Sequence, residues 1–170
     1  MFRRVARFIC ARVVISLKDF FEPITTLIKW CSKKRNTRVG VSVVLVNKKN
    51  EVLVGIRKGA HGAGLLAVPG GHIEFSEAFE TTCNRELMEE IGISFPGQYK
   101  SIGFSEDFFP EEKKHYVTLY FGVKVDSDKF VVQNLEPEKC EEWKWIPVRD
   151  LPKEGMFSKT YDIIQAWRSQ

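Results

Sequence analysis

The sequence lacks several features that define large classes of protein. Its four cysteines, Cys10, Cys31, Cys83 and Cys140, form no CxxC pair and no zinc-binding spacing. We therefore expect reduced thiols in a cytosol-like compartment, not a disulfide framework. Runs of about 18 uncharged apolar residues are absent, which disfavours a membrane-spanning helix. Internal repeats are absent too.

The sequence does contain enough apolar material for a folded domain. Its 170 residues are 44% hydrophobic and include 13 phenylalanines and four tryptophans. This composition predicts one domain, or one domain with an extension, and excludes disorder along the whole chain.

Charge divides the chain into two parts. The first 38 residues hold ten Lys or Arg against two acids, whereas the remainder holds 16 basic and 20 acidic residues. The net charge of +4 and the pI of 8.9 therefore reflect the N-terminal segment. They do not indicate that the rest of the chain binds nucleic acid.

The N-terminal segment predicts an amphipathic helix over residues 2–31. Apolar residues recur there at steps of three or four, most basic residues lie off that stripe, and Pro23 breaks or kinks the helix. Three interpretations stay open: contact with a membrane surface, a mitochondrial presequence, or a helix that merely extends the domain. We place the leader and linker at residues 1–37 and the folded domain at residues 38–170. The expected localisation is cytoplasmic, with mitochondrial and membrane-associated alternatives, and a homodimer stays open.

The rest of the chain predicts mixed strands and two separated helices, which is typical of an α/β or α+β sandwich. The helix that follows Gly70-Gly71 takes Ser76 as its expected N-cap and Gly92 as its stop. The expected strands are residues 38–46, 51–57, 65–68, 99–109, 115–125 and 142–148, and the last helix is residues 156–167.

Three acids on the first of these helices suggest a metal site. Glu86, Glu89 and Glu90 lie at positions i, i+3 and i+4, so they share an arc of roughly 100°. Three acids alone more often mark a solvated helix face. Here Gly70-Gly71 allows close approach of the backbone, and Arg85 can organise the acids through charge-assisted hydrogen bonds. Hard oxygen ligands on one face suit Mg²⁺.

Residues 71–93 resemble the signature of the Nudix hydrolases, G-x5-E-x7-R-E-U-x-E-E-x-G-U, where U is a bulky apolar residue. The chain has Gly71, then Glu77, then the run Arg85-Glu86-Leu87-Met88-Glu89-Glu90-Ile91-Gly92-Ile93, so every fixed position agrees. The resemblance extends over residues 38 to about 168. It implies the α/β/α sandwich of this family, with a mixed sheet, and leaves the N-terminal amphipathic helical extension outside.

The resemblance also implies metal ligands. Glu86 and Glu90 correspond to the principal ligands of Mg²⁺, for which Mn²⁺ is a substitute. Glu89 corresponds to a further ligand or to the residue that holds a metal-bound water. Many members use another acid outside the signature, and Glu138, Glu141 and Glu142 are the candidates in this chain.

The other signature residues have implied structural roles. Glu77 and Arg85 are expected to pair and to fix the loop–helix–loop shape, while Gly71 offers its backbone to metal or phosphate. The implied reaction is attack of water on a phosphorus atom of a nucleotide, with a carboxylate taking the proton and no covalent intermediate. No Ser-His-Asp or Cys-His arrangement in the sequence has better support.

The stretches GAHGAGLLAVPGGHIEFSE, HYVTLY and LEPEKCEEWKWIP resemble the branch that hydrolyses (deoxy)nucleoside triphosphates, including 8-oxo-dGTP, to a monophosphate and pyrophosphate. Such activity sanitises the nucleotide pool. The branch implies that Gly71, His72, Thr118 and Phe157 lie near the nucleotide. The residues around Phe157 depart from the aromatic-rich turn of the branch.

Two other functions stay open. Pro110 lies seventeen residues after Ile93, a spacing that resembles the Nudix enzymes acting on ADP-ribose, so a nucleoside diphosphate-sugar is an alternative substrate. A non-catalytic nucleotide-binding module is the other alternative.

Overall fold

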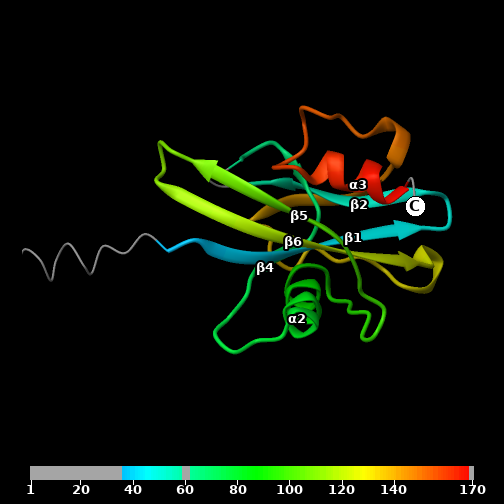
Figure 1. Cartoon of the computed structure of the whole chain (residues 1–170). Coiled ribbons are helices and arrows are strands. Elements are labelled where there is room, and N and C mark those ends of the chain that lie inside the picture. Colours follow the sequence, from blue (N-terminus) through cyan, green and yellow to red (C-terminus); the bar gives the residue numbers. More distant parts are fainter. Residues whose placement is uncertain (1–35, 59–61, 169–170) are drawn as a thin grey trace, which may run out of the picture. The chain divides into compact units, whose positions relative to one another are not determined.

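The computed structural model describes residues 36–58 and 62–168. Within these ranges, a seven-stranded mixed sheet lies between two α-helices, which confirms the expected α/β/α arrangement (Figure 1). The helices are α2 (Phe79–Ile91) and α3 (Thr160–Arg168). The strands are β1 (Arg38–Asn47), β2 (Glu51–Arg57), β3 (Leu66–Ala67), β4 (Gly70–His72), β5 (Lys100–Phe109), β6 (Lys114–Val125) and β7 (Cys140–Pro147). The helix expected over residues 2–31 lies outside the described residues.

Strand β1 is the centre of the sheet. It pairs in parallel with β6 and antiparallel with β2 and β4. The order along the sheet is β3-β2-β1-β6-β5, with β7 beside β2. A strand with layers on both faces must be apolar on both sides, which explains the nearly continuous run of β-branched residues in β1.

Each helix covers its own hydrophobic core. On one face of the sheet, Leu87 and Ile91 of α2 pack with Val43 and Leu45 of β1. On the other face, Ile164 of α3 packs with residues that include Val44 of β1. Successive side chains of β1 therefore point into alternate cores, and the two helices pack on opposite sides of the sheet.

The start of α2 differs from the expectation. Its N-cap is Ala78, without a side-chain capping bond, and Ser76 lies in the preceding loop with φ 66°. The expected Ser76 cap is therefore wrong. The carboxylate of Glu77, the next residue, accepts hydrogen bonds from Arg85 of α2. The helix ends as expected at Gly92, which adopts a left-handed conformation.

The last helix is shorter than expected. Met156 is buried and forms a bridge with Leu66, and the amide of Phe157 donates to the carbonyl of Leu66 at 2.7 Å. These residues extend the edge of β3, so α3 begins only at Thr160. The pairing turns Phe157 away from the helix and toward the cavity described below.

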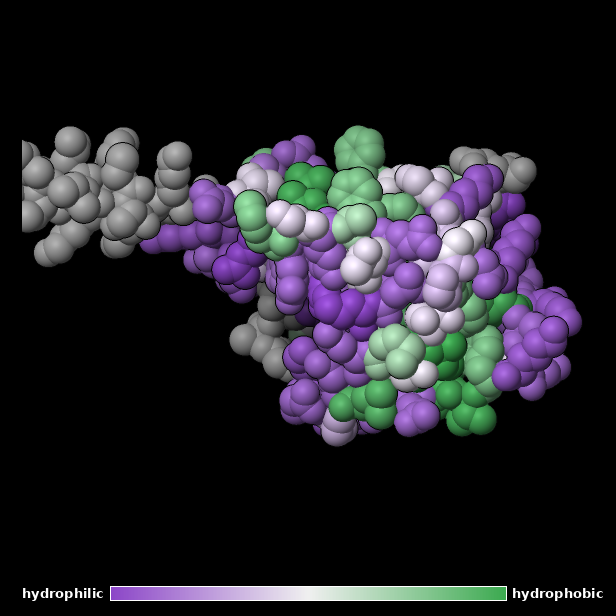
Figure 2. Space-filling model, turned by 90° about the horizontal axis from the view of Figure 1, so that it is seen from below, coloured by the Kyte–Doolittle hydropathy of each residue, from purple (hydrophilic) through white to green (hydrophobic). Residues whose placement is uncertain are grey.

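The surface on the side of α2 is mostly hydrophilic, with separate apolar areas (Figure 2). Exposed apolar side chains of the α2 region include Phe75, Phe79 and Met88. Cys83 and Cys140 are free and buried. No helix in the described ranges is long and apolar enough to cross a membrane.

Candidate active site

One cavity of about 570 Å³ collects most of the residues singled out in the sequence. Its acidic end is lined by Glu86, Glu89 and Glu90 of α2, with Gly70-Gly71 of β4 beside them. Its aromatic end is lined by Phe109 of β5, Tyr116 of β6 and Phe157. A single space therefore joins a group of carboxylates to a set of flat apolar rings.

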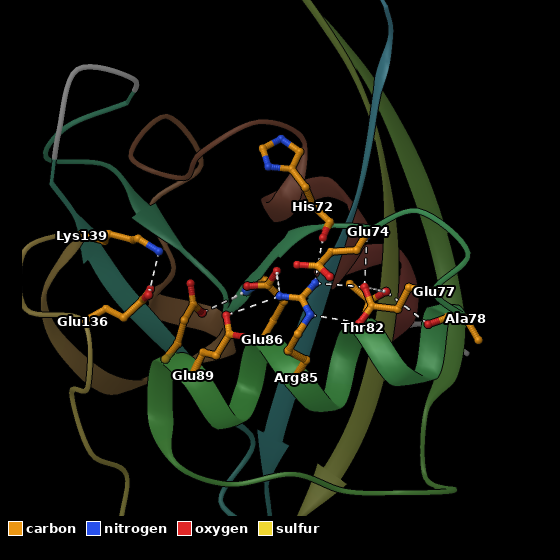
Figure 3. Close-up of polar contacts among 12 residues, drawn as sticks. His72, Glu74, Glu77, Ala78, Thr82, Arg85, Glu86, Glu89, Glu136 and Lys139 are labelled. Atoms are coloured by element: carbon orange, nitrogen blue, oxygen red, sulfur yellow. Dashed lines mark hydrogen bonds and ion pairs between the residues drawn. The ribbon is translucent and has the colours of Figure 1, made fainter.

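Arg85 is the hub of the acidic end (Figure 3). Its Nε and Nη2 atoms donate to the two carboxylate oxygens of Glu77, each at 3.0 Å. Nη2 also donates to the carbonyl of His72 at 2.9 Å, which joins α2 to β4. Nη1 donates to Glu86 Oε1 at 2.8 Å and lies 3.4 Å from Glu89 Oε2. A planar fork of donors is the group that can satisfy all of these acceptors together.

Electrostatics separate the acids into two kinds. Hydrogen bonds from Arg85 lower the pKa of Glu77 to about 2, so this carboxylate stays ionised. Burial raises the pKa of Glu86, and it raises the pKa of Glu90 to about 8. The negative charge of Glu89 further raises the pKa of Glu86, and that of Glu86 further raises the pKa of Glu90. Arg85 balances the negative charge of Glu77. The charges of Glu86 and Glu90 are not fully balanced by neighbouring groups of the protein, and we call these two acids under-compensated. Buried carboxylates in that condition favour a cation.

The two glycines hold these under-compensated acids close to β4. The amide of Gly70 donates to Glu90 Oε2 at 3.0 Å. A Cβ atom added at Gly71 would collide with the carboxylate of Glu86, and one at Gly70 would collide with the backbone of β1. Gly70 also has φ 153°, which favours glycine. Gly70 is therefore required by close packing and by backbone conformation, whereas a side chain at Gly71 would displace the Glu86 carboxylate.

The donor set fits a hard divalent cation. Glu86 Oε2 and Glu90 Oε1 have no hydrogen-bond partner among the described residues, so each carboxylate keeps an oxygen for a ligand. No group of three His, Cys, Asp or Glu in the described ranges is already gathered in coordinating geometry. The acids thus match Mg²⁺ in chemistry and burial.

The aromatic end is a chain of neighbouring rings. His72 lies 5.7 Å from Tyr116 between ring centroids, and Tyr116 lies 5.9 Å from Phe109. Phe109 and Phe157 are nearly parallel, with centroids 6.4 Å apart, and the guanidinium of Arg57 lies 4.2 Å from the centroid of Phe157. Partial burial and the nearby Arg38 lower the pKa of His72, which keeps its imidazole neutral near pH 7.

The structure brings the sequence-predicted residues Gly71, His72, Thr118 and Phe157 to this cavity together with the acids of α2. Thr118 on β6 lies opposite Gly40 of β1 and Ser105 of β5. Arg57 and Lys58, at the end of β2, also line the cavity. Trp143 and Trp145 pack against the core on the α2 side, as their shared strand face indicates.

The acids near the start of β7 differ in their position relative to the cavity. None of Glu138, Glu141 and Glu142 lines the cavity, whereas Glu136 does. Glu136 Oε1 accepts a hydrogen bond from Lys139 at 2.6 Å, and its charge contributes to the raised pKa of Glu90 (Figure 3). The position of Glu136 in the cavity depends on the conformation of the turn before β7, which the spacing of residues in the sequence does not predict.

Asp107 is a second cavity residue that sequence patterns do not single out. It belongs to β5 and lies opposite Tyr116 of β6. Its Oδ2 atom accepts hydrogen bonds from Ser158 at 2.6 Å and from Ser105 at 2.7 Å. The only signal in the sequence is the alternation Ser105, Asp107, Phe109, which puts three residues on one strand face.

A family model described as the NUDIX domain matches residues 36–167. The chain is 37% identical over 90 residues to the 8-oxo-dGTP diphosphatase of Escherichia coli; the match covers 52% of this chain and 64% of that protein. The chain thus spans slightly less than two thirds of that relative.

Solved structures share the fold. The MutT NUDIX hydrolase of Burkholderia pseudomallei superposes with a TM-score of 0.70 at 24% identity, over 77% of this chain and 98% of that one. The NUDIX domain of Shewanella oneidensis NrtR, solved with ADP ribose, superposes with a TM-score of 0.64 at 20% identity, over 79% and 88% of the two chains.

Proposed function

Because the chain belongs to the Nudix family, we propose that it hydrolyses a (deoxy)nucleoside triphosphate to the monophosphate and pyrophosphate with the help of Mg²⁺. The observation that carries this proposal is the single cavity in which under-compensated carboxylates face one end and aromatic rings face the other. A nucleotide has the matching polarity, with an anionic chain at one end and a flat base at the other. The name of the Escherichia coli relative supports the triphosphate as substrate.

The carboxylates of Glu86 and Glu90 would hold the cation, with Glu89 as an additional ligand or as a holder of water. When bound, a divalent cation neutralises polyphosphate charge and lowers the pKa of a coordinated water. Arg85 orients Glu86 and, through its contact with the His72 carbonyl, fixes the loop between β4 and α2. Mn²⁺ has the same preference for oxygen donors and is expected to substitute.

The protein also supplies groups for the nucleophile and the substrate. Glu136 lies in the cavity, where its carboxylate is suited to take a proton from the attacking water. Arg57, Lys58 and Lys139 put positive charge on the same wall, where anionic phosphates are stabilised. Phe157 and Thr118 would contact the nucleoside of the bound substrate.

The experiment is product analysis with a nucleotide panel in the presence of Mg²⁺, Mn²⁺ or EDTA. Release of pyrophosphate and a nucleoside monophosphate, abolished by EDTA and by either Glu86→Gln or Glu90→Gln, is the expected result. Glu138→Gln, a change of the same kind outside the cavity, is the matched control and is expected to keep wild-type turnover. Turnover that persists in EDTA would contradict the metal mechanism.

A nucleoside diphosphate-sugar is the second candidate substrate. Pro110 has the spacing seen in ADP-ribose enzymes, and the NrtR domain with ADP ribose shares the fold. Including ADP-ribose in the panel distinguishes the two, because its cleavage yields AMP and ribose phosphate without pyrophosphate. A protein that binds nucleotides tightly and turns over none of them would instead be a binding module.

A further inference from the structure

We propose that Asp107 reads the nucleobase and selects a guanine-type edge, which presents a ring N–H beside an exocyclic amino group. This inference rests on the proposed function, because it assigns a specificity-determining residue to the nucleoside end of that cavity. Neither the family signature nor its acids include Asp107. Its position follows from strand register and from contacts with the turn that carries Phe157.

The carboxylate of Asp107 is fixed on one side and open on the other. Its two side-chain hydrogen bonds, from Ser105 and from Ser158, both end on Oδ2. Oδ1 has no hydrogen-bond partner among the described residues, although Asp107 lines the cavity. Two serine donors thus hold one oxygen in place and leave the second as an oriented acceptor.

The neighbours of Asp107 define the shape of its ligand. Phe109 follows it by two residues on the same face of β5, and Tyr116 lies opposite it on β6. Phe157 immediately precedes the Ser158 that binds Asp107, and its ring is nearly parallel to that of Phe109. An acceptor bordered by flat apolar rings suits an aromatic heterocycle that carries hydrogen-bond donors on its edge.

The charge of Asp107 favours one base over the others. Guanine presents two adjacent donors, N1–H and N2–H₂, so both can point at Oδ1. Adenine and cytosine place a ring-nitrogen lone pair beside their amino group, which a carboxylate repels. Thymine and uracil place carbonyl oxygens on both sides of their N–H. Hydrogen bonds to charged groups discriminate more strongly than neutral ones, and a mismatched edge leaves the half-buried acceptor without a partner.

Asp107 also tethers the turn at Ser158 to β5, so a test must separate recognition from structure. Asp107→Asn provides this separation, because the amide oxygen can still accept from both serines while its NH₂ group faces the base as a donor. Asp107→Ala removes both functions. Glu106→Gln is the matched control, since Glu106 is an exposed neighbour on β5 that binds His115 at 2.9 Å outside the cavity.

The experiment measures kcat/KM for dGTP, dATP, dCTP and dTTP, together with calorimetric binding of the α,β-methylene analogues of dGTP and dATP. We expect Asp107→Asn to lower the dGTP-to-dATP ratio of kcat/KM by about 10- to 100-fold, mainly through KM, with the melting temperature kept. The ratio of analogue affinities is expected to fall by a similar factor. Glu106→Gln is expected to leave both ratios unchanged.

The outcomes distinguish this inference from the proposed function. If the wild type hydrolyses nucleotides and Asp107→Asn leaves the base preference intact, Asp107 is a structural tether and the inference fails alone. If the wild type hydrolyses no nucleotide, the proposed function fails, and the analogue affinities still decide the role of Asp107. Equal loss for all four bases, or a wild-type preference for dATP, also overturns the assignment.

Discussion

Arg85 holds Glu77 through two parallel hydrogen bonds, Nε to Oε1 and Nη2 to Oε2, both 3.0 Å long. Glu77 precedes α2 and Arg85 lies in the middle of it, so the pair ties the entry loop to the helix that carries the acids. Thr82 Oγ1, which is buried, donates to the same Glu77 carboxylate at 2.9 Å. The hydrogen bonds of Arg85 and Thr82 to Glu77 therefore fix the loop against the helix.

Arg85→Lys is expected to lower kcat/KM by about 10- to 100-fold, a loss typical of residues that orient metal ligands. Lysine keeps the positive charge, but a single ammonium cannot bind Glu77 in two places and reach Glu86 and the His72 carbonyl as well. Steady-state kinetics at several Mg²⁺ concentrations measure the effect. Wild-type kinetics in this variant would show that charge alone is sufficient.

Gly71→Ala is expected to abolish tight Mg²⁺ binding and turnover, because the added methyl group collides with the Glu86 carboxylate. Gly97→Ala is a useful control: Gly97 has open surroundings but φ 75°, so alanine there costs roughly 1–2 kcal/mol of stability without touching the site. Titration calorimetry with Mg²⁺ and thermal melting separate the two effects. Normal metal affinity in Gly71→Ala would contradict the packing argument.

The sequence predicts the acidic end of the cavity better than the aromatic end. Glu86, Glu89 and Glu90 are neighbours on one helix, so helical periodicity alone groups them. Asp107 and Ser158, by contrast, meet across a separation of 51 residues because β5 approaches the turn before α3. Periodicity describes single elements, and only the packed sheet decides which strands and turns become neighbours.

Two wrong expectations have the same physical origin. Ser76 has the composition of an N-cap, but the bidentate bond between Glu77 and Arg85 determines where the loop ends. Met156 and Phe157 continue the apolar pattern of the last helix, but their backbone pairs with Leu66 at the sheet edge. In both cases a tertiary contact overrides a local preference.

The metal-free protein is expected to lose stability as the pH rises from about 5 to 9. The folded state raises the pKa of Glu90 to about 8, against an ordinary value of 4.5, so it retains a proton that the unfolded chain releases. Stability from this group is present at low pH and is lost as the pH rises through the folded pKa. Mg²⁺ held by Glu90 would replace the proton, so the increase in melting temperature on adding Mg²⁺ should grow over this range.

Glu90→Gln is the control for this pH dependence, since glutamine cannot titrate and its amide oxygen can still accept from the Gly70 amide. In this variant the Mg²⁺-dependent increase in melting temperature should be small and nearly constant between pH 6 and pH 9. Melting curves with EDTA and with Mg²⁺ provide the measurement. An unchanged pH dependence in Glu90→Gln would assign the titration to another group.

Glu136→Gln is expected to lower kcat by about 10²-fold, the size typical of losing a general base, with a smaller change in KM. The carboxylate lies in the cavity together with the under-compensated acids of α2. Lys139 Nζ donates a hydrogen bond to Glu136 Oε1 at 2.6 Å, which orients the carboxylate. Glu138→Gln changes the same group two residues later outside the cavity and should behave as the wild type. The pH profile of kcat adds a second readout, because loss of the base removes the acidic limb, whereas a loss of charge near the phosphates alone leaves it in place. Equal activity in Glu136→Gln and Glu138→Gln would exclude Glu136 from proton transfer and would leave Glu89 as the acid best placed to act on the attacking water.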